Sequence, residues 1–303
     1  CGGKHSLYNA CQALFQKSDE VIIFKPYWVS FPDFVSVTGA TPVFVNTDSS
    51  NQNEPDFCDL EKKLNHNTRG IIINSPSNPT GGVWSDLAIK KTLDILAKYP
   101  KVWIFSDECY EQLTYSEPFK SIASFQPTNN KIITFQSCSK TYAMTGWRIG
   151  YIAGDANLVK AIGKLQGQST SCPNSIAQHA AIEALTGNQK CVETMRKKFK
   201  TRRDLIIMEL LKIPKVVCEK PNGAFYVFPD FSKYLNSIDM EGKVLKTASD
   251  LSLHILNTTG VVTVAGDSFG APGFIRLSYA TSEETIIKAI ALINSTLKKL
   301  TFK

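Results

Sequence analysis

The sequence lacks long hydrophobic runs and any apolar leader. Its 303 residues are 43% hydrophobic and 20% charged. No run approaches the roughly 18 consecutive apolar residues that cross a membrane. The first residues, Cys1 to His5, do not form the apolar segment of a signal peptide. We therefore expect a globular protein with no membrane partner and a cytoplasmic location.

The sequence also lacks the spacing of metal ligands and of disulfide frameworks. Its eight cysteines form no C-x-x-C pair, and none of its four histidines is paired at ligand spacing. These patterns predict reduced thiols and no metal site.

The net charge of +7 does not gather into a nucleic-acid-binding stretch. The densest basic cluster, residues 196–203, has helical spacing, and long charged side chains commonly coat exposed helices. This favours a solvated helix face over a nucleic-acid surface, so we expect no nucleic-acid partner.

Short apolar runs alternate with amphipathic ones through the first half of the chain. This alternation is typical of an α/β fold with a mostly parallel sheet covered by helices on both faces. The expected strands are 21–24, 42–46, 70–74, 102–106, 132–136 and 149–153.

The pattern changes towards the C-terminus, where a long helical stretch covers 172–210. A β-rich segment at 216–228, a helix at 242–256, strands at 261–264 and 273–279, and a helix at 283–300 follow. We predict a large α/β domain at residues 1–205 and a smaller α+β domain at 206–303.

Ser137-Cys138-Ser139-Lys140, followed by Gly146-Trp147-Arg148-Ile149-Gly150, is the most informative stretch. A lysine amine can condense with an aldehyde to form a Schiff base, and an arginine with serine hydroxyls can hold a phosphate dianion. The stretch also fits the S-x-x-K motif of serine acylases, but the chain has neither the S-D-N nor the K-T-G motif that completes such a site.

Three segments upstream of Lys140 also carry polar groups suited to a site. They are Gly2-Gly3-Lys4, Asn78-Pro79-Thr80-Gly81 and Asp107-Glu108-Cys109-Tyr110. The last two follow apolar runs, where open α/β sheets place their ligands. Gly3-Lys4 echoes a nucleotide-binding loop, but His5 stands where that loop requires Ser or Thr, which argues against a nucleotide.

In this order and spacing the segments resemble the class I/II aminotransferases, the pyridoxal-phosphate enzymes of fold type I. The wording of residues 26–30, 74–81 and 139–148 is most similar to the bacterial aspartate aminotransferase branch, and the resemblance runs from residue 1 to the C-terminus. It implies a sheet of the seven-stranded type. It also implies that an N-terminal segment of the family's large domain is absent here.

The resemblance assigns roles around the cofactor. Lys140 holds pyridoxal phosphate as a Schiff base and then moves the substrate's α-proton, while Asp107 pairs with the pyridine nitrogen. Glu108 is the weaker candidate, because it lies one residue after the position of the pairing acid in the family pattern. Tyr110 and Asn78 bond the phenolic oxygen, and Trp28 stacks on the ring. The bond before Pro79 is expected to be cis.

The remaining roles concern the phosphate and the substrate. The resemblance implies that phosphate is held by Gly2, Gly3, Ser137, Ser139 and Arg148. It assigns the substrate's α-carboxylate to Arg276 and Asn78 and its distal carboxylate to Lys4, with Trp28 also in contact with substrate.

The implied activity is transfer of an amino group from aspartate to 2-oxoglutarate, performed by a homodimer. Sibling enzymes for aromatic, alanine or prephenate substrates, and a carbon–sulfur lyase, remain open alternatives. So does a non-catalytic transcription regulator on the same fold, whose helix-turn-helix domain would precede Cys1.

Overall fold

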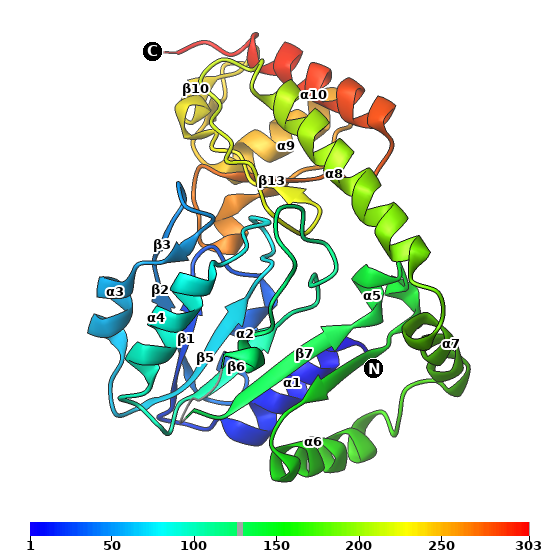
Figure 1. Ribbon diagram of the computed structural model, residues 1–303. Helices are drawn as coiled ribbons and strands as arrows, with labels where there is room; N and C mark the ends of the chain where they lie inside the picture. The colour runs from blue at the N-terminus through cyan, green and yellow to red at the C-terminus, as the bar shows by residue number, and fades with distance from the viewer. Residues whose placement is uncertain (126–129, 303) are drawn as a thin grey trace.

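A six-stranded sheet forms the centre of the N-terminal part of the protein (Figure 1). The structure, a computed structural model, describes residues 1–125 and 130–302. The strand order is β2-β1-β5-β6-β7-β8, in which neighbours are parallel except for antiparallel β7 and β8. The strands are β1 (Glu20–Phe24), β2 (Thr41–Val45), β5 (Thr68–Asn74), β6 (Trp103–Asp107), β7 (Ile132–Ser137) and β8 (Gly150–Ala153).

Each of these strands lies within two residues of its prediction, and the α/β class is confirmed. The described residues contribute six strands to the sheet, one fewer than the seven-stranded type. A small β-hairpin of β3 (Thr47–Asp48) and β4 (Glu54–Pro55) lies outside it.

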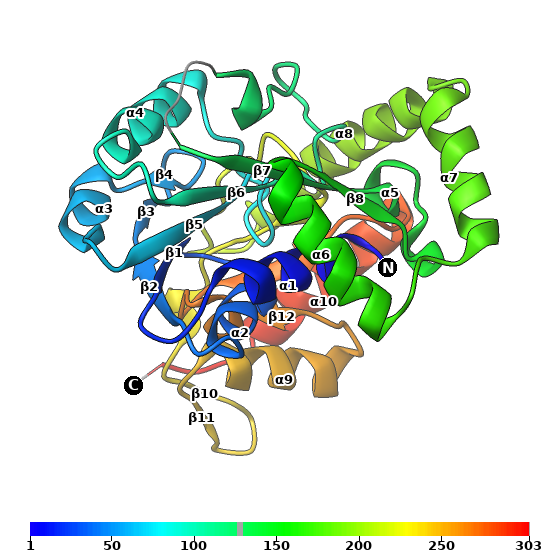
Figure 2. The same ribbon diagram turned by 90° about the horizontal axis from the view of Figure 1, so that it is seen from below.

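Helices bury both faces of the sheet. Side chains along a strand alternate between the two faces, so neighbouring residues enter different cores. Ile72 of β5 packs into one core with α1 (Gly3–Leu14), α2 (Ser30–Ser36) and α6 (Ala156–Ser169). Ile71 and Ile73 pack into a second core with α3 (Phe57–Lys63) and α4 (Asp86–Leu96). Figure 2 shows the two sets of helices on opposite sides of the sheet.

The start of α1 differs from the starts of most other helices. Asp56, Ser85 and Asp155 cap α3, α4 and α6 by accepting a hydrogen bond from a backbone N–H in the first turn. The N-cap of α1 is Gly2, which has no side chain to offer. The first N–H groups of α1 are therefore left for another acceptor.

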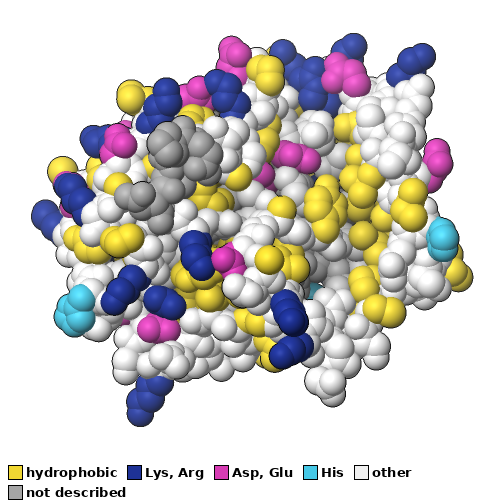
Figure 3. Space-filling view, turned by 60° about the horizontal axis from the view of Figure 1, so that its bottom comes forward, with side chains coloured by type: hydrophobic (Ala, Val, Ile, Leu, Met, Phe, Trp, Pro, Cys, Tyr) yellow, Lys and Arg dark blue, Asp and Glu magenta, His cyan; other side chains and the backbone are white. Residues whose placement is uncertain are grey.

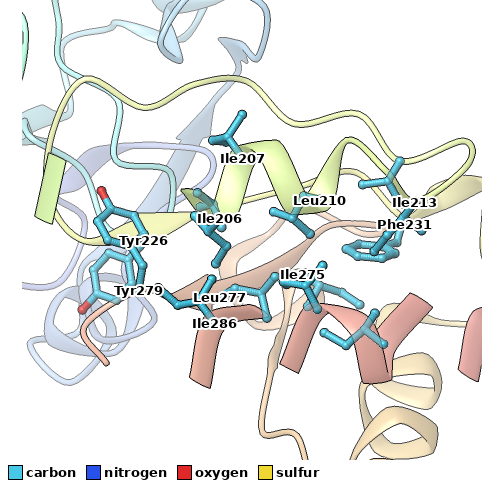
Figure 4. Packing of buried hydrophobic residues seen from close by; sticks show 14 of the residues in the cluster. Ile206, Ile207, Leu210, Ile213, Tyr226, Phe231, Ile275, Leu277, Tyr279 and Ile286 are labelled. Atoms are coloured by element: carbon cyan, nitrogen blue, oxygen red, sulfur yellow. The ribbon is translucent and has the colours of Figure 1, made fainter. Parts of the chain in front are cut away.

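The C-terminal part packs helices on a small sheet, and Figure 4 shows its buried core. Its sheet has the order β12-β13-β9, and a second hairpin pairs β10 (Ser237–Ile238) with β11 (Val244–Leu245). The other elements are α7 (Ser175–Thr186), α8 (Lys190–Leu210), β9 (Tyr226–Val227), α9 (Ala248–Thr259), β12 (Val264–Ala265), β13 (Ile275–Ser278) and α10 (Glu283–Leu297).

Four C-terminal expectations differ from the structure in their limits. The strand expected at 261–264 overlaps β12 only at Val264. The stretch 172–210 is two helices, since α7 ends at Gly187. The helix expected from 242 begins at Ala248, where Thr247 and Asp250 form a capping box. The β-rich segment 216–228 contains only β9 as a strand, because Pro221 interrupts it and its pairing is otherwise limited to isolated bridges.

The predicted domain boundary near residue 205 falls inside α8, which crosses that position without a break. The C-terminal core also receives Tyr110, Leu113 and Tyr115 from the loop after β6. A loop of the N-terminal part therefore packs into the core of the C-terminal part. The domain boundary stays a prediction.

The basic cluster at 196–203 lies on α8, and its basic side chains are exposed or half-buried except for one. Arg203 is the exception and is only 3% exposed. Its guanidinium lies over the Tyr115 ring, 4.9 Å from the centroid, and donates to the backbone oxygen of Pro221 at 3.0 Å. The expectation of a solvated face is wrong for this residue. No helix in the described ranges is long and apolar enough to cross a membrane.

Candidate active site

Three neighbouring parallel strands end in polar residues at one edge of the sheet. β5 ends at Asn74, β6 at Asp107 and β7 at Ser137. Asn74 and Asp107 are register partners, and the Asn74 amide donates to the backbone oxygen of Asp107 at 3.1 Å. The carboxyl edge of a parallel sheet is where α/β folds place ligands.

A cavity of about 370 Å³ opens at this edge. Every predicted site residue except Gly2 lines it, and it is large enough for a small organic ligand. Five further residues line the cavity that were not predicted from the sequence, which are Leu7, Asn74, Cys109, Thr145 and Tyr226.

Lys140 sits on α5 (Cys138–Thr141), a single turn of helix directly after β7. The side chain is half-buried, and its Nζ lies 5.4 Å from the ring centroid of Phe225 and 5.9 Å from that of Tyr110. Burial lowers the pKa of Lys140, and the charges of Arg276 and Arg148 lower it further. A lowered pKa increases the fraction of free amine, the nucleophilic form.

Asp107 is 5% exposed, and its carboxylate accepts a hydrogen bond from the Cys109 backbone N–H at 3.3 Å. Burial raises the pKa of Asp107 to about 6. A carboxylate buried with so little compensation favours a cationic partner, which would restore its charged form.

Glu108 is also buried but serves the loop rather than the cavity. Its Oε1 accepts from the hydroxyls of Ser106 and Ser121, both at 2.8 Å, and from the Ile122 backbone N–H at 3.2 Å. These three donors already occupy the Glu108 carboxylate, and Glu108 does not line the cavity. The geometry therefore favours Asp107, the first of the two acids, as the group that meets a ligand.

Another part of the cavity wall, formed by Gly3 and Arg148 with Gly2 behind them, is cationic and rich in donors. Gly2 has a φ of +85°, and a Cβ there would lie 2.5 Å from Nη2 of Arg148. A Cβ on Gly150 of β8 would collide with the backbone of Gly2 and Gly3. Gly2 and Gly3 therefore fit between β8 and the Arg148 side chain. Gly2 is the N-cap of α1 and Gly3 is its first residue, and the first N–H groups of a helix favour an anion.

Arg148 is held in a left-handed conformation, with a φ of +55°, and Nη1 donates to the Thr145 backbone oxygen at 2.9 Å. Its side chain is exposed. Ser137 caps α5 by accepting from the Ser139 N–H at 3.1 Å, while its hydroxyl donates to the Ile149 oxygen at 3.2 Å. Ser139 is buried at the cavity wall.

Arg276 comes from β13 in the C-terminal part and faces the same cavity. Its Nη1 donates to Oδ1 of Asn78 at 2.8 Å, and its guanidinium lies 4.6 Å from the ring centroid of Tyr226. Asn78 is buried, and the peptide bond between Asn78 and Pro79 is cis, as predicted.

Trp28 is held by edge-to-face contacts with Phe31 and Phe34, at centroid distances of 5.4 and 5.8 Å. Exposed Lys4 places its Nζ 4.9 Å from the Trp28 ring centroid. The indole and the amine are therefore neighbours on one wall of the cavity.

Tyr110 points its hydroxyl towards Tyr226, with the two oxygens 3.0 Å apart. Tyr226 was missed because it lies in an apolar run, where a tyrosine gives no signal of its own. Asn74 could have been found, since a polar residue ends a continuous apolar strand there.

These residues fit a phosphorylated pyridine aldehyde. The cavity brings together a half-buried amine with a lowered pKa, a buried carboxyl group, and a helix N-terminus with an arginine beside it. Within the described ranges, no group of three or more His, Cys, Asp or Glu side chains is arranged to hold a metal ion.

Comparisons with known proteins agree with this geometry. The family model "aminotransferase class I and II" matches residues 1–293. A probable aspartate/prephenate aminotransferase of Rhizobium leguminosarum bv. phaseoli is 42% identical over 95% of this chain and 72% of its own length. An aspartate aminotransferase of Rhizobium meliloti is 38% identical over 99% of this chain and 73% of its own.

Solved structures are similar over nearly the whole chain. A crystal structure of the aspartate aminotransferase from Rhizobium meliloti has a TM-score of 0.94 and 38% identity, covering 99% of this chain and 76% of that one. An aromatic aminotransferase from Pyrococcus horikoshii has a TM-score of 0.90 and 32% identity, covering 98% and 78%.

Proposed function

The chain belongs to the class I and II aminotransferases, and on that premise we propose that it transfers amino groups through pyridoxal phosphate bound at Lys140. The observation that carries the proposal is the cavity itself. It brings Lys140, Asp107 and Arg148 together from α5, β6 and the turn before β8.

When bound, pyridoxal phosphate supplies an aldehyde for the amine and an electron-withdrawing ring for the carbanion left after proton loss. Asp107 would pair with the ring nitrogen, Tyr110 and Asn78 would hold the phenolic oxygen, and Trp28 would cover the ring. The phosphate would be held by Gly2, Gly3, Ser137, Ser139 and Arg148.

Lys140 acts twice in this proposal. Its lowered pKa provides free amine to anchor the cofactor. Once the substrate amine has replaced it there, the Lys140 amine would take the α-proton of the substrate and deliver it to a carbon atom of the cofactor. The amine lies beside the rings of Phe225 and Tyr110, which leave less room for water around this transfer.

Arg276 would bind the substrate α-carboxylate, because it is a cation at the cavity wall whose hydrogen bond to Asn78 is to a neutral oxygen. A carboxylate offers it a charged partner that Asn78 does not.

Aspartate and 2-oxoglutarate are the substrates we propose. Lys4, beside Trp28, is a second cation placed to meet the distal carboxylate of either molecule. Relatives about 41–42% identical are named aspartate/prephenate aminotransferases, so prephenate is the second 2-oxo acid to test.

A half-reaction panel tests the function directly. The purified holoprotein is mixed with each amino acid in turn, and the absorbance of the cofactor is followed while the 2-oxo acid is assayed. Aspartate and glutamate should react fastest. Cofactor binding without release of any 2-oxo acid would indicate a sensor, and release of ammonia and sulfide from cysteine would indicate a lyase.

Replacing Lys4 with Ala tests the distal carboxylate. A charge-assisted hydrogen bond is worth roughly 1.5 to 3 kcal/mol, so kcat/KM for aspartate should fall about ten- to a hundredfold. Alanine has no distal carboxylate and should lose far less. An equal loss for both substrates would move Lys4 to the phosphate, and no loss would remove it from the site.

We also propose that the protein is a homodimer. Figure 3 shows hydrophobic side chains gathered on the side of the molecule where α7 lies. Exposed apolar residues of α6, α7 and β8 include Tyr151, Val159, Leu165, Ile176, Ile182 and Leu185. Sedimentation of Ile182→Asp should show monomer if a second copy covers this face. All eight cysteines are free thiols, which suits a cytoplasmic location.

A further inference from the structure

Two buried tyrosine hydroxyls from distant parts of the chain meet at the cavity. Tyr110 follows β6, whereas Tyr226 lies on β9, paired with Ser278 of β13. Their oxygens are 3.0 Å apart, and their rings meet edge to face with centroids 5.9 Å apart. Tyr226 is 6% exposed and lines the cavity.

A hydrogen bond between two hydroxyls uses one proton and leaves the other free. If Tyr226 donates to Tyr110, the Tyr110 proton is free to reach into the cavity. If Tyr110 donates instead, its hydroxyl hydrogen is occupied in the bond to Tyr226 and cannot reach a ligand. The direction of this bond therefore decides whether Tyr110 can serve a ligand.

The charges around the pair favour Tyr226 as the donor. Arg276 holds its guanidinium over the Tyr226 ring, 4.6 Å from the centroid. Burial raises the pKa of both phenols, but the Arg276 charge opposes the rise at Tyr226, whereas the Asp107 carboxylate adds to it at Tyr110. The more acidic hydroxyl is the better donor.

We propose that Tyr226 is a positioning residue that donates its hydroxyl hydrogen to Tyr110 and so aims the Tyr110 proton at the ligand in the cavity. This inference rests on the proposed function, because the acceptor is the phenolic oxygen of the cofactor. A chain of hydrogen bonds strengthens each member, so Tyr226 makes Tyr110 a stronger donor.

The arrangement also links two roles that the sequence analysis kept apart. Arg276 touches the Tyr226 ring and Tyr226 touches Tyr110, so the cation proposed for the substrate carboxylate acts on the donor proposed for the cofactor. Figure 4 shows Tyr226 and Tyr279 at the same end of the C-terminal core, with their hydroxyls directed away from the aliphatic residues.

Replacing Tyr226 with Phe isolates the hydroxyl, since the ring and its contact with Arg276 are kept. We expect kcat to fall about three- to tenfold, the range of one neutral hydrogen bond. A donor at the phenolic oxygen favours its ionised form, so the pH midpoint of the cofactor's absorbance should rise by about half a unit. Tyr110→Phe should shift it further in the same direction.

The double variant tests whether Tyr226 acts through Tyr110. With Phe already at position 110, Tyr226→Phe should change neither kcat nor the pH midpoint further. The matched control is Tyr279→Phe, which removes a buried hydroxyl from the same core, bonded to the Ala224 oxygen at 3.1 Å. It should lower thermal stability and leave the pH midpoint unchanged.

An unshifted midpoint in Tyr226→Phe, or equal effects of this change with Tyr and with Phe at position 110, would overturn the inference. These outcomes are distinct from failure of the proposed function. In that case the unchanged protein would neither bind pyridoxal phosphate nor release a 2-oxo acid, before any variant is compared.

Discussion

The acidic and the cationic parts of the site, which we call its acid end and its cationic end, are built in different ways. The acid end, formed by Asp107 and Asn74, lies at the ends of adjacent sheet strands, and its Asp107 is buried. The cationic end, formed by Gly2, Gly3 and Arg148, is made by a helix start and a turn, and its arginine is exposed. At the acid end, burial strengthens the interaction of one charge, that of Asp107, with a ligand. At the cationic end, several weaker donors each contribute part of the binding energy.

Lys140 lines the same cavity as both ends, and its removal should have the largest effect. Lys140→Ala removes the only group to which we assign both anchoring and proton transfer, so transamination should be abolished. Both ends remain, so non-covalent cofactor binding should persist in equilibrium dialysis. Lys160→Ala on the exposed face of α6 is the control and should react like the unchanged protein. Substantial turnover by Lys140→Ala would refute the assignment.

Asp107→Asn tests the acid end. Removing a preorganised electrostatic partner costs about two to three powers of ten in rate, and we expect kcat to fall at least that far. Glu108→Gln is the matched control, because it neutralises the adjacent buried acid that faces the loop. Its turnover should stay close to normal. A larger loss from the control than from Asp107→Asn would reverse the two assignments.

Arg148→Ala tests the cationic end, where the loss should be smaller and should fall on binding. A charge-assisted bond contributes roughly 1.5 to 3 kcal/mol, so the dissociation constant of pyridoxal phosphate should rise about ten- to a hundredfold. Arg196→Ala removes an arginine paired with Glu193 outside the cavity and serves as control. If kcat at saturating cofactor falls as steeply as in Asp107→Asn, the contrast between the two ends is wrong.

The smallest effect concerns stability rather than catalysis. The pKa of Asp107 is raised by burial to about 6, so the folded protein binds its proton more tightly than the unfolded chain does. The resulting stabilisation is complete below about pH 4 and is lost as the pH rises through 6.

Asn does not titrate, so ligand-free Asp107→Asn should gain stability relative to the unchanged protein as the pH rises. The gain between pH 4 and pH 7.5 should be about 2 to 3 kcal/mol in urea unfolding. A pH-independent difference would mean that the Asp107 carboxyl group is not desolvated in the folded protein.

The acid end could be predicted from the sequence more fully than the rest of the site. Asp107 directly follows an apolar run that the structure confirms as β6, and strand ends of a parallel sheet converge at one edge. Arg276 could be assigned only by resemblance, because nothing local indicates that β13 faces β5 and β6 across the cavity.

The C-terminal part was harder to predict because its strands are set by tertiary pairing. β9 and β12 are two residues long, and such short pairings leave no periodic pattern in the sequence. Tyr226 was missed for the same reason, since its partners Tyr110 and Arg276 come from loops and strands distant along the chain.

The central claim is that Lys140 is the amine that anchors pyridoxal phosphate. Reducing the holoprotein with borohydride fixes the cofactor to whichever lysine holds it, and peptide mapping then identifies that residue. We predict one labelled peptide, which contains Ser137 to Arg148 and carries the label on Lys140. A label on any other lysine, or no label in a protein that transaminates, would contradict the account.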